Sequence, residues 1–273
     1  MHRKTEGVKS FSSVYLGGGT PTVLPDDLLE ELLLAIISTT GADIREITVE
    51  AGRPDTITHT NLSVLKKYGV HRVSINPQTL NQSTLGVIGR DHTVYDFFEA
   101  FTMAREAGIP IINVDLIAGL PGESAIDMEN AMDIMERLSP ENITVHTLAL
   151  KRASGLIEKK DSYTIPSPQV VWEMLEIART SCAHMNLNPY YLYRQKNMAG
   201  HFENIGYSKS GTECLYNVGM MGELQSIIAV GAGAITKQVS KGKIAREQNP
   251  KNPSIYIERQ RSLSHRDGRK SYS

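Results

Sequence analysis

"SVYLGGGTPTVLPDDLLEELLLAII", residues 13–37, is the stretch of sequence that decides the fold. A short apolar strand runs into three glycines and a Thr-Pro pair, and a long helix with an apolar stripe follows. Gly17, Gly18 and Gly19 carry no Cβ, so a small polar ligand can approach the bare backbone there. The stretch therefore predicts a strand–turn–helix unit whose turn binds a ligand.

The same alternation of strand and helix continues along the chain. After the strand at 13–16, strands are predicted at 46–50, 71–76, 111–117, 142–148 and 190–193. Helices are predicted at 26–38, 55–67, 94–107, 124–138 and 168–185. A spacing of about 25 to 45 residues between strands suits the crossovers of parallel strands. The fold class is therefore α/β with a parallel sheet, either open or curled into a barrel.

Composition excludes several classes of protein. The chain has 273 residues and a net charge of −1, which argues against a nucleic-acid partner. It contains neither a signal peptide nor an apolar run that could span a bilayer, so we expect a cytoplasmic protein without a membrane partner. Its two cysteines, Cys182 and Cys214, are far apart, which excludes a disulfide framework and a Cys-x₂-Cys metal site. No metal ligands are predicted.

Polar residues follow or interrupt the predicted strands, where parallel α/β proteins bind ligands. Glu50 ends one strand, Gln78 follows the next, and Asp115 interrupts an apolar run. A carboxylate in such a run is costly unless it is hydrogen-bonded or paired, and Arg90 is a candidate partner. Each residue also has an ordinary structural explanation, and His146 fits an ordinary strand-end histidine. Taken alone, the glycine turn is weak evidence for a ligand site, because it matches neither a dinucleotide fingerprint nor a P-loop.

Four motifs in order make the pattern specific: "YLGGGTPTVL", "ITVEAGRPDTI", "VHRVSINPQTLNQSTLGVIGRDHT" and "INVDLIAGLPGES". Together they resemble the oxygen-independent coproporphyrinogen III oxidase family of radical S-adenosylmethionine (SAM) enzymes. "SINPQT", "VHTLALKRAS" and "YYLYRQKNMAGHFENIGY" resemble its coproporphyrinogen dehydrogenase branch, called HemZ. The resemblance covers residues 11–240.

The resemblance implies a partial (β/α) barrel of parallel strands that lacks its first unit and carries a loop-rich C-terminal lobe. Residues 1–185 would form the incomplete barrel, and 186–250 the last strand and the substrate-side lobe. Residues 251–273, which are charged and rich in serine, are expected to be a frayed tail. A barrel without its first strand exposes an edge, so we expect poor solubility or a need for the missing segment as a partner.

The resemblance also assigns a SAM site at the strand ends. The matching residues are Gly17, Gly18, Gly19, Thr20, Glu50, Gln78, Arg90 and Asp115. The glycine turn would lie against the methionine end of SAM, Glu50 would bind the ribose hydroxyls, and Arg90 suits the methionine carboxylate. Pro77 departs from the commoner family pattern and biases Asn76 toward extended backbone, which affects the placement of Gln78.

The family's reaction implies a substrate and a second cofactor. A reduced [4Fe-4S] cluster cleaves SAM, and the resulting radical removes hydrogen from a tetrapyrrole propionate, which loses carbon dioxide and leaves a vinyl group. The expected substrate is coproporphyrinogen III, and the electron donor is left open. Lys151, Arg152 and Arg194 are candidate clamps for the propionates, from their charge and their positions near strand ends.

The cluster ligands are missing from this sequence. The family's Cys-x₃-Cys-x₂-Cys motif precedes the glycine turn, and no cysteine stands there. A truncated or split gene is one explanation, and a natural protein without a cluster is another. The first predicts an enzyme portion that is inactive alone. The second predicts a non-catalytic protein that binds SAM, heme or a porphyrin. A third alternative lies outside this family and is an ordinary NAD- or sugar-phosphate-binding α/β protein.

Overall fold

Seven strands form one sheet in the order β1-β2-β3-β4-β5-β7-β6. Their bounds are β1 (Ser13–Leu16), β2 (Glu46–Ala51), β3 (Arg72–Ile75), β4 (Ile111–Ala118), β5 (Asn142–Thr147), β6 (Asn188–Tyr193) and β7 (Asn204–Ser208). This computed structural model describes residues 10–41, 44–149, 163–194, 202–240 and 242–267. It divides into two units, Ser10–Val218 and a second unit built mainly from Gly219 onward. The sheet belongs to the first.

The sheet is parallel on one side and antiparallel on the other. Strands β1 to β5 are parallel neighbours, as predicted. Strand β7 then pairs antiparallel with β5, and β6 pairs antiparallel with β7. The predicted partial barrel of parallel strands is therefore confirmed for β1 to β5, and an antiparallel pair extends it at this edge. The predicted strand at 190–193 is β6, but β7 was not predicted, because its "NIGYS" sequence resembles a loop.

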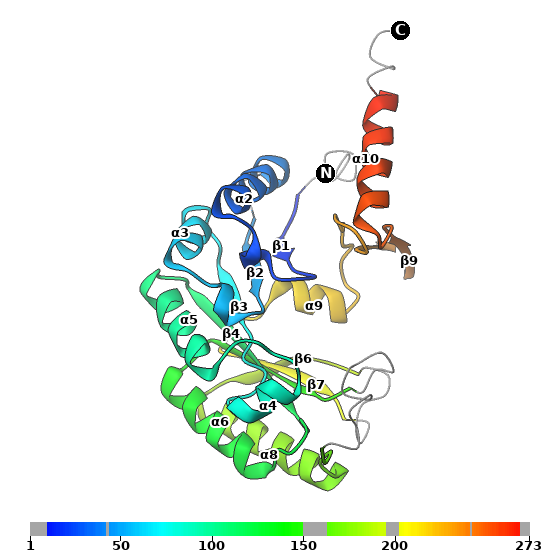
Figure 1. The fold of residues 1–273 in the computed structure, drawn as a ribbon. Helices are drawn as coiled ribbons and strands as arrows, with labels where there is room; N and C mark the ends of the chain where they lie inside the picture. The colour runs from blue at the N-terminus through cyan, green and yellow to red at the C-terminus, as the bar shows by residue number, and fades with distance from the viewer. Residues whose placement is uncertain (1–9, 42–43, 150–162, 195–201, 241, 268–273) are drawn as a thin grey trace. The chain divides into compact units, whose positions relative to one another are not determined.

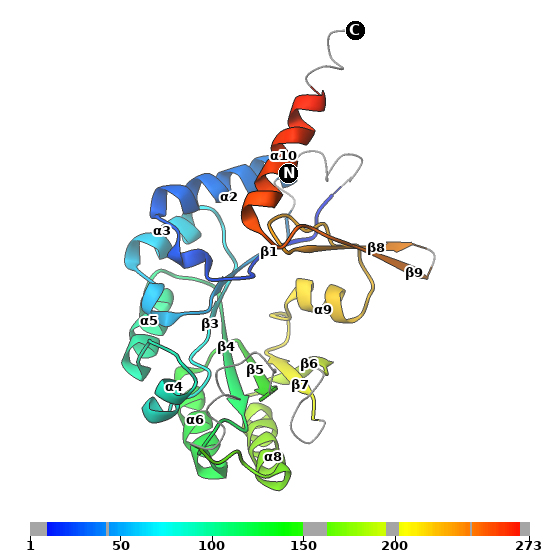
Figure 2. The same ribbon diagram turned by 45° about the vertical axis from the view of Figure 1, so that its right-hand side comes forward.

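Helices cover the convex outer side of the curved sheet (Figures 1 and 2). They are α2 (Asp26–Thr40), α3 (His59–Lys67), α4 (Gln82–Val87), α5 (Val94–Glu106), α6 (Ala125–Leu138) and α8 (Pro168–His184). Two short 3₁₀ helices, η1 (Pro21–Val23) and η2 (Pro54–Thr56), follow β1 and β2. The helix predicted at 55–67 is divided, because Thr58 forms a capping box with Asn61 and starts α3 there.

The two faces of the sheet differ in polarity. The outer face carries fully buried apolar side chains, such as Val49, Val73 and Val114, which pack in one core with helix residues such as Leu33 and Leu62. The inner face carries the alternate residues of the same strands, and these are mostly polar. They include Tyr15, Glu46, Thr48, Glu50, Arg72, Ser74, Asn113, Asp115, Asn142, Thr144, His146 and Tyr191. The curved sheet thus forms a half-barrel with a polar interior.

The division near residue 218 differs from the boundary expected near 186. Strands β6 and β7 pair with the sheet, so the first unit continues to Val218. Helix α9 (Leu215–Met221) spans the division, and the second unit has a hairpin of β8 (Ile235–Ser240) and β9 (Lys243–Gln248).

The expected frayed tail is instead largely helical, as α10 (Pro253–Asp267). Its start is set by Asn252, whose side chain accepts hydrogen bonds from the backbone of Ser254 and Ile255. Among the helices of the described ranges, none combines the length and the apolar character that crossing a bilayer requires.

Candidate functional site

Glu50 and the glycine turn meet at the carboxyl end of β2. The Tyr15 hydroxyl donates to Glu50 Oε1 at 2.7 Å, and the backbone N–H of Gly18 faces Oε2 at 3.3 Å. A Cβ on Gly17 would lie 2.7 Å from Glu50 Cδ and 2.8 Å from Tyr15 Cε1. Gly18 has a φ of 89°, a conformation that favours glycine. The turn therefore needs glycine so that the backbone can reach the carboxylate.

The carboxylate of Glu50 is half-buried. Burial raises its pKa, the hydrogen bonds from Tyr15 and Gly18 lower it, the nearby Asp115 raises it, and the net shift is upward. Among the described residues, no Lys or Arg forms an ion pair with Glu50. A carboxylate in this setting is suited to accept hydrogen bonds from ligand hydroxyls.

Tyr15 was not singled out from the sequence, although it supports Glu50 directly. Its ring stacks on that of Tyr216, with the ring centroids 4.3 Å apart. Burial and the neighbouring Glu50 raise the pKa of the Tyr15 phenol, so its hydroxyl remains a donor. The sequence feature that could have indicated Tyr15 is the alternation of side chains along β1. It places Tyr15 on the same face of the sheet as Glu50.

Asp115 lies at the centre of the inner face. Asn113 Nδ2 donates to its Oδ1 at 2.8 Å, and His146 Nε2 lies 3.5 Å from its Oδ2. Burial raises the pKa of Asp115, but hydrogen bonds from His146, Asn113 and Thr144 outweigh it and leave the pKa below its usual value. The partner of Asp115 is therefore His146, and the suggestion that Arg90 fills this role is wrong.

Gln78 is fixed against β4 by its backbone. Its N–H donates to the carbonyl of Asp115, and its own carbonyl accepts from Ile117, at 3.1 and 2.8 Å. Its φ is 70°, the left-handed region that is uncommon outside glycine. His92 Nε2 lies 3.3 Å from the carbonyl of Pro77, the preceding residue. These contacts place Gln78 beside Asp115 despite the Asn-Pro sequence before it.

Arg90 lies at the same end of the sheet. Its Nη1 donates to the carbonyl of Gly52, just after β2, at 3.4 Å. Burial and the nearby Arg53 lower its pKa, whereas Asp115 and Asp55 act in the opposite direction. The guanidinium is half-buried and, among the described residues, donates one hydrogen bond, to Gly52, so its other N–H groups can bind an anionic ligand group. Thr20 is the N-cap of η1, and its carbonyl accepts from the backbone N–H of Val23.

A second polar cluster lies at the opposite end of the inner face. Arg72 Nη1 is 2.8 Å from Glu46 Oε2, and both side chains are almost fully buried. Arg72 also donates to Asn142 and to the carbonyl of Thr212, at 3.0 and 2.6 Å. Glu46 accepts from the backbone of Leu215 at 3.1 Å. This cluster, which forms the floor of the half-barrel, holds the segment before α9 against the sheet.

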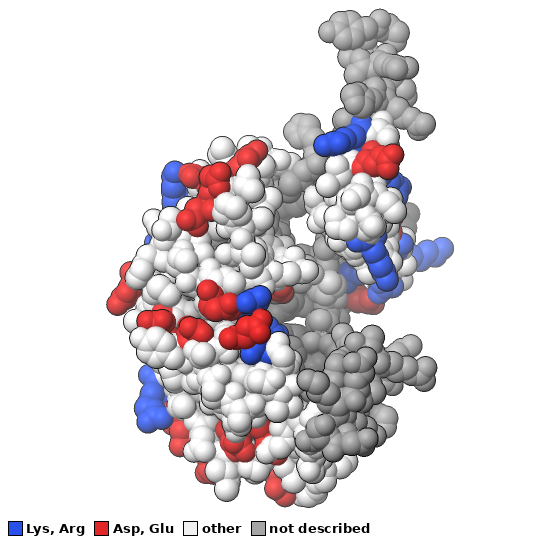
Figure 3. Space-filling view, viewed as in Figure 1, with Lys and Arg blue, Asp and Glu red and all other residues white. Residues whose placement is uncertain are grey.

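The candidate substrate residues are only partly described. Lys151 and Arg152 lie outside the described residues. Arg194 follows β6, is mostly exposed, and pairs with Glu203 at 3.2 Å. Elsewhere on the surface, Figure 3 shows acidic and basic side chains interspersed on the viewed face of the first unit.

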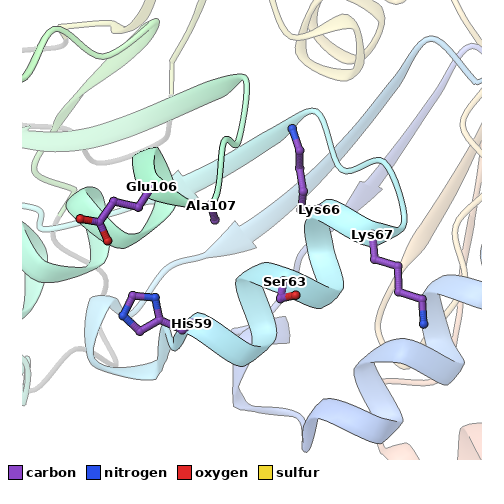
Figure 4. Close-up of a pocket in the computed structure, with 6 residues that line it drawn as sticks. All are labelled: His59, Ser63, Lys66, Lys67, Glu106 and Ala107. Atoms are coloured by element: carbon purple, nitrogen blue, oxygen red, sulfur yellow. The ribbon is translucent and has the colours of Figure 1, made fainter.

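A shallow depression of about 420 Å³ lies on the helical side of the molecule, away from the inner face (Figure 4). It is lined by His59, Ser63, Lys66, Lys67, Glu106 and Ala107. The Lys66 amine donates to the carbonyl of Gly108, and the Lys67 amine pairs with Glu30. Both lysines are therefore already occupied.

The two cysteines do not form a metal site. Cys182 is on the buried face of α8 and packs in the core, and burial raises the pKa of its thiol to about 12. Cys214 lies beside Glu46 at the floor, and burial raises its pKa to about 11. In the described part of the chain, no group of three His, Cys, Asp or Glu residues is arranged to hold a metal ion. Protonated, separate thiols do not fit a [4Fe-4S] cluster, which needs several thiolates.

Comparison with known proteins identifies the family. The model of the radical SAM superfamily matches residues 4–135. This chain contains a radical SAM domain. Over 254 residues it is 45% identical to the oxygen-independent coproporphyrinogen-III oxidase-like protein HemZ of Bacillus subtilis, which covers 91% of this chain and 50% of HemZ. It is 30% identical to the heme chaperone HemW of the same organism, over 84% of this chain and 58% of HemW.

The radical SAM fold is confirmed by a solved structure. Coproporphyrinogen III oxidase (HemN) of Escherichia coli, a radical SAM enzyme, superposes with a TM-score of 0.68 and 20% identity. The match covers 89% of this chain and 55% of HemN. The chain therefore spans about half the length of these relatives. Within that half, four of the residues predicted to bind SAM make hydrogen bonds toward the carboxyl ends of β2 to β4. They are Glu50, Gln78, Arg90 and Asp115.

Proposed function

We propose that this chain is the SAM-binding and substrate portion of an oxygen-independent coproporphyrinogen III oxidase-like enzyme of heme biosynthesis. The observation that carries the proposal is the half-buried carboxylate of Glu50, held by Tyr15 and by the glycine turn at the strand ends. The likeness to HemZ extends over 91% of the chain and supports the same reading. The reaction would be the oxidative decarboxylation of coproporphyrinogen III propionates to vinyl groups.

The residues present fit SAM. Glu50 would accept hydrogen bonds from the ribose hydroxyls, because it is a half-buried carboxylate without a cationic partner among the described residues. The carbonyls of the glycine turn would accept from the methionine ammonium, and Arg90 would hold the methionine carboxylate. Gln78 and Asp115 would complete the polar wall. When bound, SAM supplies the 5′-deoxyadenosyl group, while these residues orient it and exclude water.

The residues present do not fit the [4Fe-4S] cluster that the family implies. The only two thiols of this sequence are buried, separated and held in their protonated form. We therefore expect this polypeptide alone to bind SAM without cleaving it. Anaerobic reconstitution with iron and sulfide should leave the chain colourless. Stoichiometric iron and sulfide in the purified sample would contradict this expectation.

The substrate would lie beside the inner face. Its propionates are anionic, so Arg194 is a candidate contact, together with Lys151 and Arg152 outside the described residues. Arg194 would exchange its exposed partner Glu203 for a propionate, because an exposed ion pair adds little stability.

Isothermal titration of SAM into the chain tests the proposal. Wild type should bind, and Glu50→Gln should weaken binding at least about tenfold, since a charged hydrogen bond to a ribose hydroxyl is lost. Asp115→Asn should also weaken it. Glu30→Gln is the matched control, because Glu30 pairs with Lys67 on the helical surface. Failure of wild type to bind, or equal binding by Glu50→Gln, would overturn the proposal.

A second candidate function is non-catalytic binding of heme or a porphyrin, which the 30% identity to a heme chaperone favours. The same protein can be titrated with heme and followed by the Soret band. Saturable one-to-one heme binding without SAM binding would favour this candidate over the first.

A further inference from the structure

Asp115, His146 and Tyr193 form one line of contacts across the inner face. His146 Nε2 lies 3.5 Å from Asp115 Oδ2, and its other ring nitrogen, Nδ1, lies 3.3 Å from the Tyr193 hydroxyl. The three residues come from β4, β5 and β6 and therefore span the junction between the parallel and antiparallel parts of the sheet. The line begins at a carboxylate predicted for SAM and ends on the last strand.

The geometry selects one arrangement of protons for the neutral imidazole. If Nε2 carries the proton, it donates to the Asp115 carboxylate, and Nδ1 accepts from the Tyr193 hydroxyl. If Nδ1 carries the proton instead, the lone pair of Nε2 faces the carboxylate and repels it. Both rings are restrained, because the His146 and Tyr193 planes meet edge to face at 72°. The contacts therefore form a directed relay from the phenol to the carboxylate.

The relay is not needed simply to satisfy Asp115. Asn113 already donates to Oδ1 of the carboxylate at 2.8 Å, and Asn113 is itself tied to Ser74 and Thr144. With Oδ1 held by Asn113, the second contact at Oδ2 fixes the rotation of the carboxylate plane. The side chains of Asp115 and His146 are 19% and 25% exposed, so a ligand in the half-barrel can still reach the pair.

We propose that His146 is a positioning residue that orients Asp115 for SAM, and that Tyr193 holds His146 from the other side. This proposal rests on the proposed SAM-binding function. The proposal adds one residue of β5 and one of β6 to the SAM site. The family resemblance assigns SAM contacts to neither strand. His146 acts through Asp115 and is not assigned a contact with the reacting atoms.

The first test needs no SAM. Long-range ¹H–¹⁵N spectra of the full chain report which nitrogen of each histidine carries the proton, and the His146→Gln spectrum identifies the signal among the eight histidines. In wild type the neutral His146 ring should carry its proton on Nε2. In Asp115→Asn this preference should weaken, because the charged acceptor is gone. A proton on Nδ1 in wild type, or no response to Asp115→Asn, would overturn the relay.

The second test measures SAM affinity by titration. His146→Leu should weaken binding about tenfold, whereas His146→Gln, which keeps one N–H donor, should stay within about threefold of wild type. Tyr193→Phe should fall between them. His59→Leu, on the outer surface of α3, is the matched control. Equal affinities for His146→Leu and wild type would refute the positioning role.

The two tests separate the possible failures. If wild type does not bind SAM, the proposed function fails while the spectra still decide the relay. If His146→Leu does not fold, as judged by circular dichroism, His146→Gln and Tyr193→Phe carry the affinity test. Loss of affinity in His146→Gln equal to that in His146→Leu would mean that the residue only fills space, and would also refute the proposal.

Discussion

Glu46 and Glu50 stand on the same face of β2, yet their surroundings are opposite. Glu46 is almost fully buried, pairs with Arg72 at 2.8 Å and accepts from the Leu215 backbone. Glu50 is half-buried and accepts from a phenol and a backbone amide, without a cation among the described residues. In the strand sequence EITVEA, successive side chains alternate between the two faces of the sheet, and both glutamates are on the inner face.

The comparison separates a structural carboxylate from one that suits a ligand. At the floor, each charge is matched by an opposite charge and by further hydrogen bonds, so the pair holds strands and the segment before α9 together. At the mouth of the half-barrel, where the strands have their carboxyl ends, burial keeps the pKa of Glu50 above its usual value. A bound ligand would supply further hydrogen-bond donors to this carboxylate. Stability should therefore depend on the floor, and binding on the mouth.

The largest expected effect comes from breaking the floor pair. Arg72→Met should lower the free energy of unfolding by about 3–5 kcal/mol, because it leaves the Glu46 carboxylate buried without its cation. Urea denaturation followed by circular dichroism measures the change. The double variant Arg72→Met with Glu46→Leu should recover part of the loss. A loss below about 1 kcal/mol for Arg72→Met would show that the floor does not depend on this pair.

The glycine turn gives the next largest effect. Gly17→Ala should destabilise the chain by about 1–3 kcal/mol, since the new methyl group would clash with Glu50 and Tyr15. Gly19→Ala is the matched control, because a Cβ there meets nothing within 4 Å and the backbone is not left-handed. Denaturation curves without SAM compare the two. Equal stability of the two variants would remove the argument that Gly17 is needed for the close approach to Glu50.

Tyr15→Phe tests the support of Glu50 more gently. It removes one hydrogen bond and keeps the stacking on Tyr216, so the free energy of unfolding should fall by about 0.5–1.5 kcal/mol. The pKa of Glu50 should rise further, because the lost hydrogen bond lowers it. Carboxyl ¹³C shifts followed through a pH titration measure this pKa, and a downward movement would contradict the prediction.

The smallest effect concerns pH. Because folding raises the pKa of Glu50 above 4.5, its contribution to stability is fully present below that value and is lost as pH rises through the folded pKa. Wild type should therefore lose stability relative to Glu50→Gln between about pH 4 and pH 7, by about 1 kcal/mol or less. Paired denaturation series at both pH values measure the difference. A change of opposite sign would mean that the fold favours the ionised carboxylate.

Much of the fold follows from the sequence. The alternation of apolar strands and amphipathic helices predicts β1 to β5 and the longer helices between them to within a few residues, but not the short helix α4. Strand β7 escapes prediction because its inner-face residues are Asn204, Gly206 and Ser208, which are typical of loops. Gly206 has a packing reason, since a Cβ there would lie 1.8 Å from Cε1 of Tyr191 and clash with its ring.

The candidate site is harder to predict than the fold. Strand-end position indicates Glu50 and Gln78, because side chains at one end of a parallel sheet lie near one another, and Asp115 is indicated by its place in an apolar run. Partners cannot be obtained this way, since pairing depends on the register between strands. Sequence alone thus suggests Arg90 for Asp115, whereas the register brings His146 there.

The order of the last strands has a consequence for how the chain folds. In the described sheet, β6 hydrogen-bonds to β7, and only β7 connects it to β5, although β6 is synthesised first. Tyr193 therefore cannot reach His146 until the later segment has docked. We therefore expect this edge of the polar interior to form only when β7 pairs with β5, and hydrogen exchange there should report that step separately from the parallel strands.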